Sequence, residues 1–225
     1  MLRGEPAVTP THSQDRAIFL VDGFNLYHSL RQAQSDLAQA GEPSGTKWLD
    51  LFGLCRAHLS SVSATATLSE VRYFTALAGW SQAKLRRHED YLECLKATGV
   101  RVRVGRFKDK VVTCRARCGQ KFLASEEKET DVAIGVALLA VLFENRCENA
   151  VILSADSDYV PAVEEAKRLF PDKRVLCAFP YARNSEDLRR VARVFRLSRE
   201  SYVKHPLPDP FVLTPTRSIS KPAGW

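Results

Sequence analysis

Short apolar runs alternate along this chain with longer segments in which apolar residues recur every three or four positions. The short runs predict buried strands, and the longer segments predict helices that pack against those strands. The predicted strands are residues 17–21, 70–76, 100–104, 150–153, 174–178 and 194–197. The predicted helices are residues 24–39, 49–59, 82–98, 131–145, 159–169 and 185–191. This regular alternation predicts an α/β fold with a doubly wound, mostly parallel sheet.

Some segments stand apart from this alternation. Residues 1–16 contain no long apolar run and are expected to be flexible. Residues 107–123 are basic and irregular, and we expect them to form a hairpin inserted into one domain that spans residues 17–204. Residues 205–225 hold five prolines and are expected to form an extended or mobile tail. Residues 131–145 are apolar almost all round, which predicts a helix buried against the sheet.

The composition restricts the class of protein. With 225 residues, 45% of them hydrophobic, the chain is long enough to bury a complete core. No apolar run approaches the length needed to cross a bilayer, and the N-terminal residues lack the apolar segment of a secretory signal. Six cysteines at scattered spacings indicate reduced intracellular thiols and not a disulfide framework. We therefore expect a soluble cytoplasmic protein that does not enter a membrane.

The positive charge is concentrated in two blocks. The net charge is +7, and residues 80–121 contain twelve Lys or Arg against four Asp or Glu. Residues 183–204 contain seven basic residues against three acidic ones. Such blocks are typical of a protein that binds a polyanion, most often a nucleic acid. A merely solubilising surface produces the same pattern, so charge alone leaves both interpretations open.

Carboxylates follow two of the predicted strands. Asp22 comes directly after the first strand, and Asp156 follows the fourth strand, with Asp158 two residues later. Asp131 opens a predicted helix. If the first and fourth strands are neighbours, these acids meet at the carboxyl edge of the sheet, where parallel sheets bind ligands. Each acid also has an ordinary explanation, as a turn residue, a helix cap or an acid in the first turn of a helix.

Several carboxylates at one point would raise each other's pKa unless a cation joined them. Mg²⁺ or Mn²⁺ prefers such oxygen ligands and retains water molecules for chemistry. One or two of these ions would orient a water for attack on a phosphodiester, while the basic surface held the phosphate backbone. The acidic residues and the basic blocks together favour metal-dependent hydrolysis of a nucleic acid.

Three segments together resemble the NYN-domain family, a LabA-like branch of the PIN-like nuclease superfamily. They read VDGFNLYHSL at residues 21–30, EEKETDVAIGVALL at 126–139 and LSADSDYVPAVEEAKRL at 153–169. The family pattern is a strand followed by D-x-x-N, then E-K-x-x-D-V, then S-x-D-S-D-[FY]. Each motif alone is weak evidence, and the three in this order are specific. The resemblance extends over about residues 17–198.

The resemblance implies a PIN-like three-layer α/β/α sandwich with a central, mostly parallel sheet. It also implies a Mg²⁺- or Mn²⁺-dependent ribonuclease, which we expect to be an endonuclease. It assigns Asp22, Asp131 and Asp156 as metal ligands, direct or through water, and Asp158 as a further ligand or a supporting acid. Asn25, one helical turn after Asp22, would position a water or a phosphate. All five are predicted catalytic residues, and the four aspartates form the predicted metal site.

A second set of side chains is predicted to contact the RNA substrate. These residues are Lys128, Ser154, Ser157, Arg101, Arg103 and Arg106. The lysine belongs to the E-K-x-x-D segment and would touch a phosphate, or it would be an ordinary solvated lysine. The two serines would hydrogen-bond the carboxylates, or they would serve as turn and cap residues. The three arginines would hold the phosphate backbone.

Exposed aromatic side chains commonly stack on the bases of single-stranded RNA. Trp80, Phe107 and Tyr181 are candidates for this role, although burial is the commoner fate of an aromatic residue. His28 lies one turn after Phe24 on the first predicted helix. It is a candidate for approaching the acidic site, and an ordinary position on the helix surface is the commoner alternative.

Cys114 and Cys118 on the predicted hairpin resemble half of a zinc knuckle. A closed structural zinc site needs four ligands. Only these two cysteines lie here, and no histidine is near them in the sequence. Free thiols are the simpler interpretation, and structural Zn²⁺ is the less favoured one.

Other functions stay open at this point. A catalytically inactive NYN-domain adaptor would bind RNA with the same fold and basic face, but such a protein would be expected to lose some of the acids, and all four are present. A phosphatase or phosphotransferase with an aspartyl nucleophile typically carries D-x-D after its first strand, whereas residues 22–25 read DGFN. The sequence leaves the RNA target, the number of metals and the oligomeric state undetermined, and a homo-oligomer is among the options.

Overall fold

The computed structural model describes residues 15–77, 81–113 and 121–225. In this part of the chain seven strands form one sheet, in the order β4-β3-β2-β1-β5-β6-β7. The strands are β1 (Arg16–Asp22), β2 (Thr67–Ala76), β3 (Arg101–Thr113), β4 (Lys121–Lys128), β5 (Asn149–Leu153), β6 (Arg174–Phe179) and β7 (Arg193–Arg196). Neighbouring strands are parallel except β3 and β4, which are antiparallel. The predicted α/β fold with a mostly parallel central sheet is confirmed.

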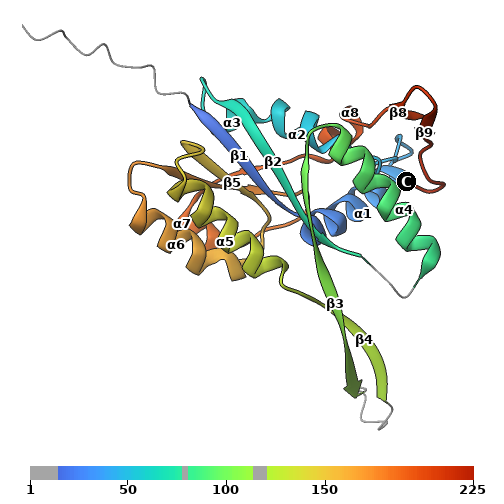
Figure 1. The fold of residues 1–225 in the computed structure, drawn as a ribbon, viewed down its shortest axis with the longest axis horizontal. Helices are drawn as coiled ribbons and strands as arrows, with labels where there is room; N and C mark the ends of the chain where they lie inside the picture. Colours follow the sequence, from blue (N-terminus) through green and yellow to red (C-terminus); the bar gives the residue numbers. More distant parts are fainter. Residues whose placement is uncertain (1–14, 78–80, 114–120) are drawn as a thin grey trace, which may run out of the picture.

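Helices cover both faces of this sheet (Figure 1). They are α1 (Gly23–Gln39), α2 (Leu51–Ala57), α3 (Leu59–Val62), α4 (Gln82–Ala97), α5 (Thr130–Phe143), α6 (Val160–Leu169), α7 (Glu186–Val191) and α8 (Arg199–Lys204), with a short 3₁₀ helix η1 (Ser157–Tyr159). One hydrophobic core joins the sheet to α1, α2 and α4, and a second joins it to α5, α6 and α7. Burial on both faces explains why β1 is an almost unbroken apolar run. The fold is the predicted three-layer α/β/α sandwich.

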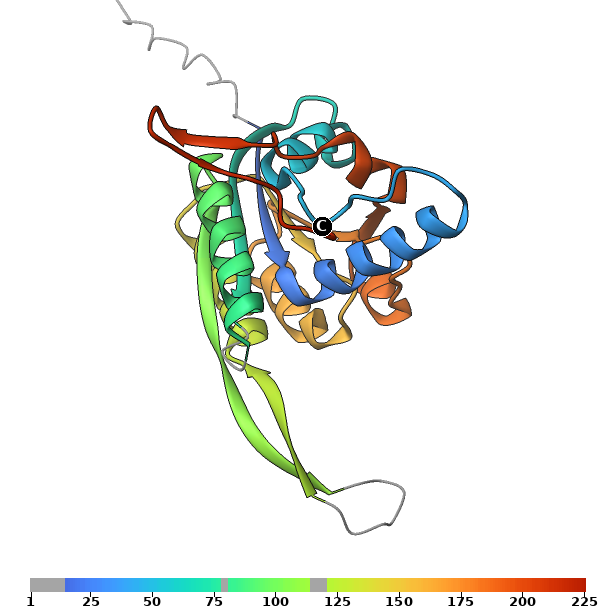
Figure 2. The ribbon, with the colours of Figure 1, turned by 90° about the vertical axis from the view of Figure 1, so that its right-hand side faces the viewer.

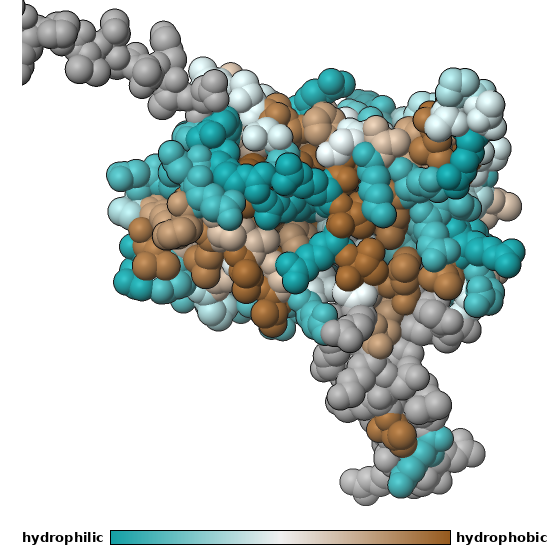
Figure 3. Space-filling model, in the orientation of Figure 1, coloured by the Kyte–Doolittle hydropathy of each residue, from teal (hydrophilic) through white to brown (hydrophobic). Residues whose placement is uncertain are grey.

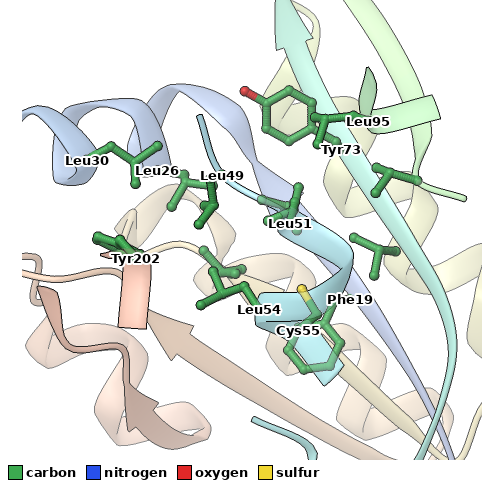
Figure 4. Packing of buried hydrophobic residues seen from close by; sticks show 14 of the residues in the cluster. Phe19, Leu26, Leu30, Leu49, Leu51, Leu54, Cys55, Tyr73, Leu95 and Tyr202 are labelled. Atoms are coloured by element: carbon green, nitrogen blue, oxygen red, sulfur yellow. The ribbon is translucent and has the colours of Figure 1, made fainter. Parts of the chain in front are cut away.

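Side chains of β1 alternate between the two helical layers. Phe19 and Val21 pack with α1, α2 and α4, whereas Leu20 packs with α5 and α6. Figure 4 shows Phe19 close to Leu54 of α2. Because Asp22 follows Val21 in the same strand, the alternation directs its side chain to the α5 layer.

Two helices differ from their predictions. The helix expected at residues 49–59 is divided at His58, where α2 ends and α3 begins. The helix α5 is buried on one face only, because its outer face carries Val132, Val136 and Phe143 with exposed fractions of 57–81%. Figure 3 shows this side of the molecule, with apolar side chains gathered over α5. The prediction that α5 is buried was therefore wrong for its outer face, which is apolar but exposed.

The basic hairpin predicted near residues 107–123 is formed by β3 and β4. The strand β3 pairs with β2 only as far as Gly105, opposite Ala76. It then continues past the carboxyl edge of the sheet, paired with β4 alone from Arg106 to Thr113. Figures 1 and 2 show the hairpin projecting away from the sandwich. Cys114 and Cys118, and with them the zinc hypothesis, lie outside the described residues.

The C-terminal segment is not the extended or mobile tail that its prolines predicted. It forms a second small sheet of β8 (Phe211–Thr214) and β9 (Arg217–Ile219). Its apolar residues Leu207, Phe211 and Ile219 are buried in the core that contains α4. The ring of Trp225 packs edge-on against Tyr91 of α4, at 5.4 Å between ring centroids. Proline restricts a backbone without preventing its apolar neighbours from packing, so the segment joins the domain.

None of the helices in the described ranges is both long and apolar enough to span a bilayer.

Candidate active site

Asp22 lies at the point where β1 ends and α1 begins. Its Oδ1 accepts a hydrogen bond of 2.9 Å from the backbone N–H of Asn25, which caps the helix. Its Oδ2 accepts hydrogen bonds from the hydroxyls of Ser154, at 2.9 Å, and Tyr159, at 3.1 Å. The carboxylate is only 4% exposed. Because Val21 pairs with Leu153 in β5, the sheet itself brings Ser154 beside Asp22.

Burial raises the pKa of Asp22 above its ordinary value, and the charge of Asp131 raises it further. The hydrogen bonds from Asn25, Ser154 and Tyr159 act in the opposite direction, because each stabilises the ionised form. Burial is the largest of these effects, so the direction is upward. An ionised Asp22 is therefore stabilised by its donors but still lacks a compensating positive charge among them.

Tyr159 connects Asp22 to a second carboxylate. Its hydroxyl lies 2.7 Å from Oδ1 of Asp131, which belongs to the first turn of α5, while it also contacts Asp22. The Tyr159 ring is buried, and burial followed by the charges of the two aspartates raises its pKa well above the ordinary value. Asp131 itself is exposed. Sequence reasoning gave Tyr159 no role, although it directly follows the acidic pair in the SDSDY segment.

Ser154 links Asp22 to the third predicted ligand. The Ser154 hydroxyl accepts a hydrogen bond of 3.1 Å from the backbone N–H of Asp156 while it donates to Asp22. Asp156 uses Oδ1 to accept from the N–H of Asp158, at 3.1 Å, and so caps η1. Asn25 uses Oδ1 to accept from the N–H of Ala155, at 3.3 Å. The loop after β5 is thereby tied to the start of α1.

Direct contacts thus join Asp22 to Ser154 and, through Tyr159, to Asp131. Asp156 is linked to Ser154 through its backbone N–H, and Asp158 and Ser157 are exposed on the same loop. The motifs that supply these residues agree with a comparison of the whole chain: the family model of the NYN domain matches residues 16–198. The chain belongs to the NYN-domain family. NYN domains form a PIN-like nuclease family, and the α/β/α sandwich described above is consistent with that fold.

One solved structure supports the fold of this NYN domain. A crystal structure of a protein of unknown function from Vibrio parahaemolyticus matches with a TM-score of 0.54 and 16% sequence identity, covering 84% of this chain and 97% of that one. At this identity the likeness concerns the fold alone. A crystal structure of MurG from Acinetobacter baumannii matches with a TM-score of 0.33 and 12% identity, covering 80% of this chain and 41% of that one, and carries no argument. No curated protein matches the chain.

A divalent ion at this edge of the NYN domain would need oxygen ligands from its carboxylates. In the described ranges, no three or more His, Cys, Asp or Glu side chains gather closely enough to hold one metal ion. The described residues therefore form no closed site of three carboxylates. Mg²⁺, however, is commonly held by only one or two protein carboxylates and completes its shell with water and substrate phosphate. Asp22 and Asp131, which share the Tyr159 hydroxyl, fit an open site of that kind.

Arginines line a groove of about 260 Å³ on the α5 side of the sheet. The groove lies between β2, β3 and α5, and its lining residues are Arg72, Phe74, Arg101, Val102, Arg103 and Ala137. Asp22 pairs with Phe74, and Phe74 pairs with Arg103, so Arg103 is level with Asp22 across one strand. Arg101 lies two residues earlier in β3, farther from the carboxyl edge of the sheet, and forms an ion pair of 3.2 Å with Glu70. Among the described residues Arg103 has no ion pair.

The remaining predicted contacts are less informative. The backbones of Arg106 and Lys128 pair with each other at the base of the hairpin, and their side chains lie outside the described part of the structure. Trp80 also lies outside it. Tyr181 donates its hydroxyl hydrogen to Asp36 at 3.0 Å and is half-buried. Phe107 is half-buried as well.

Proposed function

We propose that this NYN domain hydrolyses phosphodiester bonds of RNA, as an endonuclease, with Mg²⁺ or Mn²⁺ held by Asp22 and Asp131. The observation that carries the proposal is the joining of these two carboxylates by the Tyr159 hydroxyl, at the carboxyl edge of the sheet. Membership of a PIN-like nuclease family supports the reaction class. The arginine groove level with Asp22 supports a polyanionic substrate.

The two carboxylates differ in exposure and in hydrogen bonding, so they would have different roles in the site. Asp131 is exposed and is accessible to an ion and to water, whereas Asp22 is buried and held by three donors. Tyr159 orients both, since one hydroxyl hydrogen is shared between two acceptors. A bound divalent ion supplies the charge that polarises the phosphate and lowers the pKa of a water molecule.

Further residues would complete the site. Asp156 and Asp158, on η1 and its cap, would bind the ion through water or support the other acids. Asn25 uses its side-chain oxygen internally, which leaves its amide nitrogen to donate to a phosphate oxygen. Arg103 would hold a flanking phosphate in the groove. Ser154 would position Asp22, while Ser157, Lys128, Arg101 and Arg106 remain predicted substrate contacts.

Cleavage of end-labelled RNA and DNA tests the proposal, with Mg²⁺, with Mn²⁺ or with a chelator. We expect internal cuts in RNA that need the metal and that fall at least about 100-fold in Asp22→Asn and Asp131→Asn. Asp156→Asn tests the third acid in the same assay. Asp172→Asn is the matched control, because Asp172 is an exposed acid in the turn before β6, at the opposite edge of the sheet. Cleavage unchanged in both Asp22→Asn and Asp131→Asn would refute the assigned site.

An RNA-binding adaptor without catalysis is the second candidate. It is favoured because, in the described ranges, no three acids gather closely enough to hold one ion, and because Asp22 is buried among neutral donors. Such a protein would bind RNA equally well with chelator and with metal and would cut it under neither condition. The same assay, with a gel-shift measurement beside it, separates the two candidates.

A further inference from the structure

Two aromatic side chains lie exposed at the start of α1. Phe24 is 51% exposed and Tyr27 is 43% exposed. His28 packs edge-on against Phe24, with ring centroids 4.5 Å apart, and against Tyr27 at 5.9 Å. The opposite face of α1 carries Leu26 and its neighbours into the core. The three rings thus form one aromatic surface on the solvent side of the helix, which we call the α1 platform.

The α1 platform adjoins the candidate active site. Phe24 is two residues after Asp22. Asn25, which lies between Phe24 and Tyr27, donates its backbone N–H to Asp22 and accepts a hydrogen bond from Ala155 in the loop after β5. With a rise of 1.5 Å per residue, the surface from Phe24 to Arg31 extends about 10 Å along the helix. The α1 platform therefore begins within one helical turn of Asp22 and extends along α1 away from it.

Positive charge borders the α1 platform. The Arg31 guanidinium lies 6.0 Å from the centroid of the Tyr27 ring. The loop that carries Arg183 is hydrogen-bonded to α1, because the Ser29 hydroxyl donates to the backbone oxygen of Tyr181 at 2.7 Å. Burial, and then the charges of Arg183 and Arg31, lower the pKa of His28. The Nε of Arg183 is buried and has no hydrogen-bond partner. Within the described ranges neither arginine has an ion pair, so no carboxylate in these ranges neutralises either charge, and both charges can attract an anion outside the protein.

We propose that the α1 platform binds unpaired bases of single-stranded RNA by stacking on Phe24 and Tyr27, with Arg31 and Arg183 holding the adjacent phosphates. This inference rests on the proposed ribonuclease function, whose substrate it defines as RNA that is unpaired beside the cleaved bond. Proteins recognise single-stranded RNA with exposed aromatic rings, which stack on the bases, and with nearby positive charges, which bind the phosphates. Stacking requires unpaired bases, because only these have a free face. In a duplex those faces are already stacked.

Binding without cleavage tests the α1 platform. A short fluorescein-labelled oligoribonucleotide and the same strand in a duplex are titrated, with chelator present, and Kd is measured by anisotropy. Phe24→Ala and Tyr27→Ala are each expected to weaken single-strand binding about 5- to 100-fold, and Phe24→Trp is expected to preserve it. Arg31→Gln and Arg183→Gln are expected to reduce the dependence of Kd on salt concentration. Both aromatic side chains are largely exposed, so the folded state is expected to survive, as checked by thermal melting.

Phe143→Ala is the matched control, because Phe143 is an aromatic residue that is 81% exposed on α5. It is expected to leave Kd unchanged. Single-strand binding unchanged in Phe24→Ala and Tyr27→Ala overturns the inference, and so does an equal loss of single-strand and duplex binding. If the wild type binds the single strand through these residues but cuts no RNA with any metal, the proposed hydrolysis fails while the α1 platform stands. If it cuts RNA and both alanine variants bind as the wild type does, the platform alone fails.

Discussion

The hydroxyl of Tyr159 lies 2.7 Å from Oδ1 of Asp131. The same hydroxyl is 3.1 Å from Asp22, so one buried phenol joins carboxylates from β1 and from α5. This contact converts two acids on separate elements into a single site. It also sets their spacing, because both carboxylates must remain within hydrogen-bonding distance of one oxygen atom.

Tyr159→Phe removes only the oxygen atom that joins the two acids. We expect the rate of RNA cleavage to fall about 10- to 100-fold, because a partner that orients metal-binding carboxylates is lost. The free energy of unfolding should fall by about 1–2 kcal/mol as one buried hydrogen-bond donor disappears. Both are measured with one protein preparation, by gel assay and by urea unfolding.

Tyr91→Phe is the control for this experiment. Tyr91 is also buried and donates to the backbone oxygen of Leu49 at 3.0 Å, in the other helical layer. It should show a similar loss of stability with no loss of cleavage. Equal loss of cleavage in both variants would mean that Tyr159 acts through stability alone.

Asp22→Asn tests the cost of burying a carboxylate. Burial raises the pKa of Asp22, so its ionised form is less favoured in the folded than in the unfolded chain. The neutral amide avoids this penalty, and we expect the free energy of unfolding near neutral pH to be equal or higher by about 1 kcal/mol. The gain in melting temperature that Mg²⁺ or Mn²⁺ produces in the wild type should disappear. A strongly destabilised variant would show that Asp22 chiefly stabilises the fold, by accepting hydrogen bonds from Ser154 and Tyr159 at Oδ2.

Glu148 links the start of β1 to the turn before β6. It accepts hydrogen bonds from the backbone N–H and the guanidinium of Arg16, and Lys173 lies 3.4 Å away. The hydrogen bond from Arg16 is the main cause that lowers the pKa of Glu148 from 4.5 to about 2. Since the folded form holds its proton more weakly, this contribution is present above pH 4.5 and is lost as the pH falls toward 2.

Glu148→Gln should therefore destabilise the protein by about 1 kcal/mol near neutral pH, a value reduced by solvent screening of a partly exposed pair. Urea unfolding of both proteins over the acid range should show the two free energies converging as the pH decreases. A difference that stays constant, or that grows on acidification, would contradict the assignment.

The C-terminal segment should contribute to stability through its buried ring. Phe211 is 9% exposed and packs in the main core, whereas its neighbour Val212 is 66% exposed. We expect Phe211→Ala to lower the free energy of unfolding by about 2–3 kcal/mol, because it leaves a partial cavity at the margin of the core. Val212→Ala, on the same strand, should change it by less than about 0.5 kcal/mol. Equal values would mean that the segment is not docked in solution.

Arg103 and Arg101 should differ in their contribution to RNA binding. Arg103 is level with Asp22 and has no ion pair in the described part of the chain, whereas Arg101 is already paired with Glu70. Arg103→Gln should weaken binding and reduce the slope of log K against log salt by about 1. Arg101→Gln should change both quantities less. The measurement is a salt titration of single-strand affinity, and the reverse order of effects would shift the RNA path away from Asp22.

Local patterns predicted most of the architecture. The strands β1 and β5 were recognisable because a strand covered on both faces must be apolar at nearly every position. The acids Asp22 and Asp156 were recognisable because they stand at or shortly after the end of an apolar run. The three motifs that match the NYN domain are also local, so they can be recognised in the sequence alone.

The tertiary structure decided which of these local features meet. Pairing of β1 with β5 brings Ser154 to Asp22, and the packing of α5 on the sheet brings Asp131 to Tyr159. A periodicity of three or four residues carries no information on contacts between positions 28 or 132 residues apart. The docking of the C-terminal segment and the exposure of Phe24 also depend on which neighbour covers each side chain. The sequence gives the polarity of each residue, but only the tertiary structure determines which other residues it contacts.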